Sequence, residues 1–232
     1  MLIVIFVGLI FALLGAFAER LASVWPADEA SRRGFGPRTA ILALVSAAAG
    51  AAITWRSQLP AWATAAYLIL LALLVVLSAT DLEQRRLPHL VLDPLIVGAI
   101  AFVPFNPSVR IGDALIGAAV AVGFLGLLGL LVRGGVATGD LYLVAPLGLL
   151  LGWPAIFLAI FVAALLAALA SLALLATRRV GMKSYIPFGP FLVAGAVVTL
   201  LREPQLLGHQ LALLPTAPGA LTVILAHLAG SR

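Results

Sequence analysis

Long runs of apolar residues, separated by short polar stretches, fill most of the chain between residues 2 and 202. A membrane-spanning helix needs about 20 mostly apolar residues, with roughly 17 as a lower limit. The runs that we interpret as helices are 2–18, 38–54, 61–80, 89–104, 111–132, 141–153, 155–177 and 187–202. The pattern therefore predicts an all-α fold, a polytopic transmembrane bundle of about eight helices. Because 141–153 is short, we expect a tilted or partly inserted helix there.

The last apolar run divides the chain into two parts. We interpret residues 1–202 as one transmembrane domain and residues 203–232 as a C-terminal tail. The tail holds the apolar stretches Leu206–Leu214 and Leu221–Leu228, which are too short and too interrupted by proline to span. We expect interfacial helices or loose packing in the tail.

Composition agrees with a chain surrounded by a lipid bilayer. Hydrophobic residues make up 63% of the chain and charged residues only 10%, against roughly 25% charged residues in soluble domains. The formal charge of +5 is no sign of a nucleic-acid partner here, because the basic residues of a membrane protein report its orientation. We predict no binding of nucleic acid.

The basic residues alternate in number from one inter-helix loop to the next. The loops after the first, third, fifth and seventh segments hold ten: Arg20, Arg32, Arg33, Arg38, Arg85, Arg86, Arg133, Arg178, Arg179 and Lys183. The opposite ends hold four, if the tail is counted: Arg56, Arg110, Arg202 and Arg232. The positive-inside rule assigns the first face to the cytoplasm, so we predict that the N-terminus lies outside.

The residue types present restrict the chemistry. Cysteine is absent, which excludes disulfides, thiolate zinc sites and cysteine nucleophiles. The three histidines are scattered and none forms an H-x-x-x-H pair, so a zinc protease is poorly supported. We predict no metal and no other cofactor, and any catalysis must rest on Asp, Glu, Ser, Thr, Tyr or Lys.

Two aspartates stand at the predicted cytoplasmic ends of apolar runs. Asp81 directly follows the run Ala61–Thr80, and Asp140 directly precedes the run Leu141–Leu151. Each position taken alone is explained by the ending or capping of a helix. Taken together, two carboxyl groups can hydrolyse a peptide bond, one as a base toward water and the other, protonated, as an acid. Only a folded bundle could bring these two together.

Asp93 is a third acid to consider, about five residues inside the fourth apolar run. An ionisable group inside a membrane is a functional hypothesis by default. Its position near the interface and beside Pro94, which frees a backbone carbonyl, also permits a local hydrogen-bonded role. The sequence leaves both interpretations open.

Four stretches of the chain, in order, resemble motifs of one known family. They are Gly15-Ala16-Phe17 with Pro26, Asp81-Leu82-Glu83-Gln84-Arg85-Arg86-Leu87-Pro88, Thr138-Gly139-Asp140, and Ile186-Pro187-Phe188-Gly189-Pro190-Phe191. Together they resemble the prepilin peptidases, also called type IV leader peptidases, of the GxGD class of intramembrane aspartyl proteases. The resemblance covers about residues 10–200.

The resemblance implies a function and a set of site residues. It implies an aspartic-type endopeptidase of the bacterial inner membrane that removes the short basic leader from prepilin or pseudopilin precursors at the cytoplasmic face. Asp81 and Asp140 would be the catalytic pair. The remaining motif positions, with a substrate-binding or structural role, are Pro88, Thr138, Gly139, Pro187, Gly189 and Pro190. Which precursor is cut, and the oligomeric state, stay open.

The chain departs from the family pattern at several places. Ala137 stands where the family has the first glycine of GxGD, Tyr142 where it has lysine, and Glu19 where it has asparagine. A short loop, Glu19–Pro37, replaces the cytoplasmic domain with paired Cys-x-x-Cys that many members carry. We therefore predict no zinc and leave N-methyltransferase activity open.

Two other classes of protein compete with the peptidase hypothesis. The first is a non-catalytic homologue that serves the assembly of a pilus or secretion system, which the altered positions 137 and 142 make plausible. The second is an unrelated transporter, whose signature would be broken helices with polar residues at mid-membrane. An approach of Asp81 to Asp140 would favour the peptidase.

Overall fold

The structure is a computed structural model that describes residues 1–25, 35–131, 137–177, 187–203 and 206. These residues form eight α-helices and a short 3-10 turn, which confirms the predicted all-α bundle. The elements are α1 (Leu2–Ala22), α2 (Pro37–Arg56), α3 (Ala61–Gln84), α4 (His89–Phe102), the turn Val103–Phe105, α5 (Ile111–Leu131), α6 (Thr138–Leu151), α7 (Ala155–Ala176) and α8 (Gly189–Arg202). Apart from Leu206, the tail after Glu203 lies outside the described residues, so its prediction stays untested.

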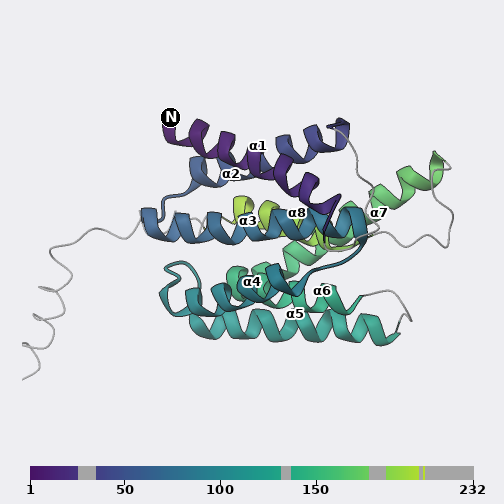
Figure 1. The fold of residues 1–232 in the computed structure, drawn as a ribbon. Coiled ribbons are helices and arrows are strands. Elements are labelled where there is room, and N and C mark those ends of the chain that lie inside the picture. The colour runs from purple at the N-terminus through teal and green to yellow at the C-terminus, as the bar shows by residue number, and fades with distance from the viewer. Residues whose placement is uncertain (26–34, 132–136, 178–186, 204–205, 207–232) are drawn as a thin grey trace, which may run out of the picture.

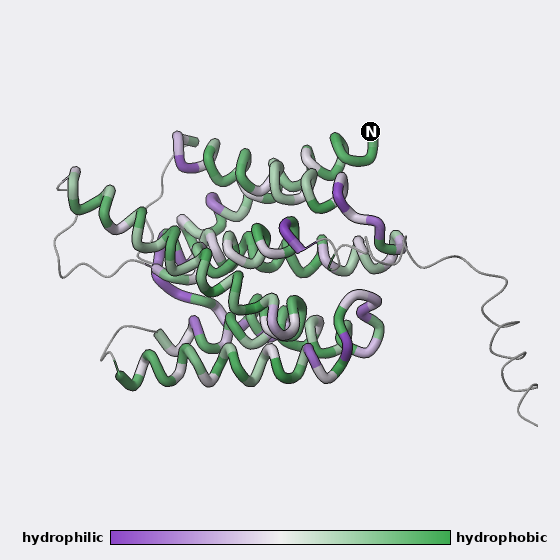
Figure 2. The backbone as a smooth tube through the Cα atoms, turned by 180° about the vertical axis from the view of Figure 1, so that it is seen from behind, coloured by the Kyte–Doolittle hydropathy of each residue, from purple (hydrophilic) through white to green (hydrophobic). Residues whose placement is uncertain are grey.

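Five of these helices are long and apolar enough to cross a membrane: α1, α2, α3, α5 and α7. The other three, α4, α6 and α8, have only 14 residues each. Apolar residues colour most of every helix in Figure 2, as expected where lipid surrounds a bundle. The chain is thus a multi-pass membrane protein.

The helices pack in layers around α3 and α8. In Figure 1, α1 and α2 lie above this central pair, α4 and α6 lie below it with α5 beneath them, and α7 crosses behind. The closest neighbours are α1 with α2, α5 with α6, and α7 with α8. The C-terminal ends of α1, α3, α5 and α7 point to one side of the bundle (Figure 1), in the alternation that the basic residues predicted.

Glycine brings several of these helices into backbone contact. A Cβ on Gly15 would lie 2.7 Å from the carbonyl oxygen of Leu42, and a Cβ on Gly148 would lie 2.5 Å from the Cα of Ala118. Small residues at such positions let the backbones of membrane helices approach closely. Gly15 of the first motif therefore serves the packing of α1 on α2.

A hydrogen-bonded link holds α3 and α6 together at the end of the bundle opposite to Asp81. The hydroxyl of Tyr67 donates to the carbonyl of Leu150 at 3.3 Å and accepts from the side-chain amide of Asn106 at 3.0 Å. Tyr67 is buried, so this link satisfies polar groups that water cannot reach. It fixes the register of α3 against α6, and with it the relative heights of Asp81 and Asp140.

Candidate active site

Asp81 lies one turn before the end of α3, and its side chain is buried, with 6% of the residue exposed. The helix ends at Arg85, which adopts a left-handed conformation with φ of 53° and donates its N–H to the carbonyl of Asp81 at 2.9 Å. This turn redirects the chain to Pro88, the N-cap of α4. The motif from Asp81 to Pro88 is therefore the connection between α3 and α4.

Asp140 lies in the first turn of α6 and is 3% exposed. The helix begins at Thr138 instead of Leu141, so the predicted start was three residues late. Its carboxylate Oδ2 accepts the backbone N–H of Ala137, the N-cap residue, at 3.2 Å. Asp140 is thus the third residue of the helix and not its N-cap, although its side chain bonds back to the N-cap backbone, and this bond fixes the orientation of the carboxyl group.

Gly189 lies between Asp81 and α6, the helix that carries Asp140. Its backbone N–H donates to Oδ2 of Asp81 at 3.1 Å. A Cβ on Gly189 would lie 2.6 Å from that oxygen and 3.5 Å from Cδ2 of Leu143, which is one turn beyond Asp140. The N-terminus of α8 is therefore placed between the end of α3 and the first turns of α6.

The end of α3 and the first turns of α6 both pack against α8, so the two carboxyl groups lie on neighbouring elements. Both carboxylates also face a helix N-terminus: Asp140 lies in the first turn of α6, and Asp81, on α3, accepts the N–H of Gly189 at the start of α8. The unpaired N–H groups and the dipole of such an end favour a negative charge. The structure thus brings the two predicted aspartates into one buried site.

The remaining motif residues shape the backbone around this site and contribute no reactive side chain to it. Gly139 packs against Leu87, to which a Cβ would come within 3.0 Å. Thr138 is exposed at the start of α6. Pro187 and Pro190 are half-buried on either side of the Phe188–Gly189 turn into α8. These residues form the backbone turns that present Asp140 and the N–H of Gly189.

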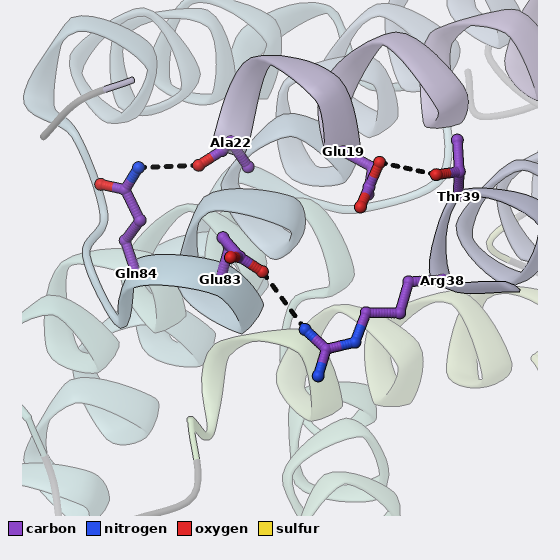
Figure 3. Close-up of polar contacts among 6 residues, drawn as sticks. All are labelled: Glu19, Ala22, Arg38, Thr39, Glu83 and Gln84. Atoms are coloured by element: carbon purple, nitrogen blue, oxygen red, sulfur yellow. Dashed lines mark hydrogen bonds and ion pairs between the residues drawn. The ribbon is translucent and has the colours of Figure 1, made fainter. Parts of the chain in front are cut away.

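A polar cluster joins the adjoining ends of α1, α2 and α3 (Figure 3). The hydroxyl of Thr39 donates to Glu19 at 2.8 Å, and Arg38 pairs with Glu83 at 3.3 Å. The side-chain amide of Gln84 donates to the carbonyl of Ala22 at 2.7 Å. Sequence analysis named Glu19, Arg38, Glu83 and Gln84 for other reasons, but nothing local in the sequence indicates that these residues meet.

Asp93 does not join the buried pair. Its side chain is 65% exposed, and its carboxylate meets Nδ1 of His89, one turn earlier on α4, at 3.2 Å. The ring of His89 in turn meets the ring of Tyr142 edge-on, with centroids 5.8 Å apart. These contacts favour the local hydrogen-bonded role for Asp93.

The backbone conformation at position 137, where the chain has alanine in place of the family's glycine, does not require glycine. Ala137 has a φ of −79°, an extended conformation that any residue adopts, so glycine is not required there. Among the described residues, no group of three or more His, Cys, Asp or Glu side chains is arranged to hold a metal ion.

Comparison with known proteins identifies relatives for the central part of the chain. Residues 68–172 match the type IV leader peptidase family. A prepilin leader peptidase/N-methyltransferase of Aeromonas hydrophila is 36% identical over 149 residues, which are 61% of this chain and 51% of that protein. A protein of the same name from Bacillus subtilis is 29% identical over 140 residues, 57% of this chain and 54% of that protein.

A further relative of the same name, from Pseudomonas aeruginosa, matches at 29% identity over 178 residues, 74% of this chain and 60% of that protein. The chain thus spans about half the length of the curated relatives it matches. No solved structure matches it.

The fold and the site define a class: a multi-pass helical membrane protein with two buried carboxyl groups at one end of the bundle. Within that class, the chain is similar to the type IV leader peptidase family over residues 68–172, a segment that contains both aspartates.

Proposed function

We propose that the chain is a membrane-embedded aspartyl endopeptidase that removes the short basic leader from type IV prepilin-like precursors at the cytoplasmic face of the inner membrane. The observation that carries the proposal is the convergence of Asp81 and Asp140, both buried, around the N-terminus of α8. The names of the relatives support the substrate class.

The geometry suits acid–base hydrolysis by a pair that shares one proton. Two carboxyl groups in one buried site do not both ionise readily, so one remains available as an acid while the other is a base. The base takes a proton from a water molecule that attacks the peptide carbonyl, while the acid gives its proton to the carbonyl oxygen. The base then passes the proton from water to the leaving nitrogen, and the carboxylate left by the acid takes a proton back from a hydroxyl of the intermediate as the C–N bond breaks. The N–H groups of Gly189 and Ala137 hold the carboxylates in place.

The test is co-expression of the chain with a type IV prepilin, with leader removal followed on a gel. Asp81→Asn and Asp140→Asn, made separately, each keep the side-chain shape but remove the proton transfer. We expect each to lower the cleavage rate by about 10²- to 10⁴-fold, as for other general acid–base groups. The protein level in the membrane is measured alongside.

Asp93→Asn is the matched control, because Asp93 is an exposed acid of the same type outside the pair. We expect it to cleave at nearly the unmutated rate. If the unmutated chain leaves several precursors intact, the proposal is wrong and the chain is a non-catalytic homologue that serves pilus or secretion-system assembly.

A further inference from the structure

The last turn of α3 carries both Asp81 and Gln84, the final residue of the helix. The side-chain amide of Gln84 donates to the backbone carbonyl of Ala22 at 2.7 Å. Ala22 is the final residue of α1 and is buried. Figure 3 shows this bond crossing from the end of one helix to the end of the other. The proposed acid–base chemistry uses neither Gln84 nor Ala22.

The bond satisfies a carbonyl that the geometry of α1 leaves without a helical partner. The last four carbonyl groups of an α-helix have no N–H to accept within that helix, and Ala22 stands at this end of α1. A buried carbonyl without a donor is costly. Gln84 supplies the donor from another helix, so the contact depends on an N–H group at the tip of side chain 84.

The bond also lies between two helix ends of the same sign. α1 and α3 pack against each other, and their C-terminal ends point to the same side of the bundle (Figure 1). The C-terminal end of a helix carries a partial negative charge. A hydrogen-bond donor or a cation therefore stabilises this junction, and a carboxylate in the same place opposes it.

The neighbouring ion pair cannot replace this bond. Glu83, also in the last turn of α3, pairs with Arg38 of α2 at 3.3 Å, but the side chain of Arg38 is 66% exposed. Exposed pairs of this kind contribute little, because water and salt screen them. Gln84 is thus the stronger polar contact between the end of α3 and the first two helices.

Asp81 depends on this last turn for its position. The N–H of Arg85 closes the turn by bonding to the carbonyl of Asp81 at 2.9 Å, and the helix ends there. Because helix ends unwind more readily than helix interiors, the turn needs contacts that hold it. Gly189 holds the carboxylate of Asp81 from α8, and Gln84 holds the backbone of the turn from α1.

We propose that Gln84 is a positioning residue for Asp81. Its bond to the carbonyl of Ala22 anchors the last turn of α3 on α1 and so fixes the place of the Asp81 carboxyl group. The consequence for the reaction rests on the proposed function. The proposal gives α1 a part in the site, although none of the groups proposed to react lies on that helix.

Two substitutions of Gln84 test the anchor by the sign of the charge that they introduce. Gln84→Glu keeps the size of the side chain but replaces the donor with a carboxylate, whereas Gln84→Lys keeps a donor and adds a positive charge. With a type IV prepilin as substrate, we expect Gln84→Glu to lower kcat by about tenfold or more while KM stays the same, because a displaced reacting group slows the chemical step. We expect Gln84→Lys to restore kcat to nearly the unmutated value.

Gln58→Glu is the matched control, because Gln58 is an exposed glutamine between α2 and α3, at the other end of α3 from Asp81. We expect its kcat to equal that of the unmutated chain. An equal loss in Gln84→Glu and Gln58→Glu, or in Gln84→Glu and Gln84→Lys, would overturn the proposal.

A thiol-labelling measurement follows the same turn without any cleavage. The chain contains no cysteine, so Thr80→Cys places a single thiol at a buried position directly before Asp81. A buried thiol reacts only when the surrounding structure opens, so we expect N-ethylmaleimide to label it about tenfold faster when Gln84→Glu is added. With Gln84→Lys added, the labelling rate should stay the same.

The two measurements separate this inference from the proposed function. If the unmutated chain leaves the prepilin uncut while labelling responds to Gln84→Glu, the peptidase proposal fails alone. If the chain cuts the prepilin but Gln84→Glu changes neither kcat nor labelling, the positioning proposal fails alone. Faster labelling without a fall in kcat would also overturn it, because the anchor would then have no bearing on Asp81.

Discussion

Gly189 shows how one residue without a side chain holds the site together. Its N–H bonds to Asp81, and its missing side chain leaves room for the Asp81 carboxylate and for Leu143. An added methyl group would lie 2.6 Å from Oδ2 of Asp81. Because that oxygen is the far end of a rotatable side chain, the carboxyl group would move aside while the helices stay in place.

We therefore predict that Gly189→Ala lowers the cleavage rate by about 10²-fold, the effect of displacing a reacting group by about 1 Å. The thermal unfolding of the protein in detergent should change little. Gly112→Ala is the control, because Gly112 is likewise in the first turn of a helix and a Cβ there meets nothing within 4 Å. A stable Gly189→Ala variant with full activity would contradict this role of Gly189.

The two aspartates were predictable from the sequence, whereas their supporting contacts were not. Asp81 and Asp140 are conspicuous because so few acids border the apolar runs. The bond from Gly189 to Asp81 joins positions 108 residues apart, and no local pattern encodes such a contact. The same holds for the pairing of Glu83 with Arg38, 45 residues away.

At the scale of helices, the contact between α5 and α6 depends on glycine. A Cβ on Gly148 would lie 2.5 Å from the Cα of Ala118, and a Cβ on Gly117 would lie 2.7 Å from the carbonyl oxygen of Gly148. The opposing atoms belong to the backbone, so the two helices would have to separate. Asp140 begins α6 and would be displaced with it.

We predict that Gly148→Ala destabilises the protein by about 1–3 kcal/mol, the range for overpacking an interior. This exceeds the gain of up to about 1 kcal/mol from the higher helix propensity of alanine. Thermal unfolding in detergent measures the difference. Gly123→Ala on α5 is the comparison, since a Cβ there meets nothing within 4 Å; an equal effect at both positions would exclude packing as the cause.

The extents of the helices followed from the apolar runs, because each run must be long enough to cross lipid. Even the short stretch predicted at 141–153 is a helix, α6, although it spans Thr138–Leu151. The shift has a local cause, since the bond from Ala137 to Asp140 starts the helix before the aspartate. Which helices become neighbours could not be predicted, because nearly every face of these helices is apolar.

For the whole molecule, the alternation of basic residues predicts an orientation that labelling can check. The absence of cysteine allows single cysteines to be placed at two exposed sites: Gln58→Cys between α2 and α3, and Arg86→Cys between α3 and α4. We expect a membrane-impermeant maleimide to label Gln58→Cys in intact cells and Arg86→Cys only after the inner membrane is permeabilised. The reverse pattern would show that the N-terminus is cytoplasmic.

The three short helices have a consequence for the membrane itself. At 14 residues each, α4, α6 and α8 are about 21 Å long at 1.5 Å per residue, while the hydrocarbon layer is about 30 Å thick. Lipid next to these helices must thin, or water and headgroups must enter above them. We therefore expect the bilayer to be thinner beside the helices that carry Asp140 and Gly189, so that hydrophobic mismatch gives water a path to carboxyl groups that the helices themselves keep buried.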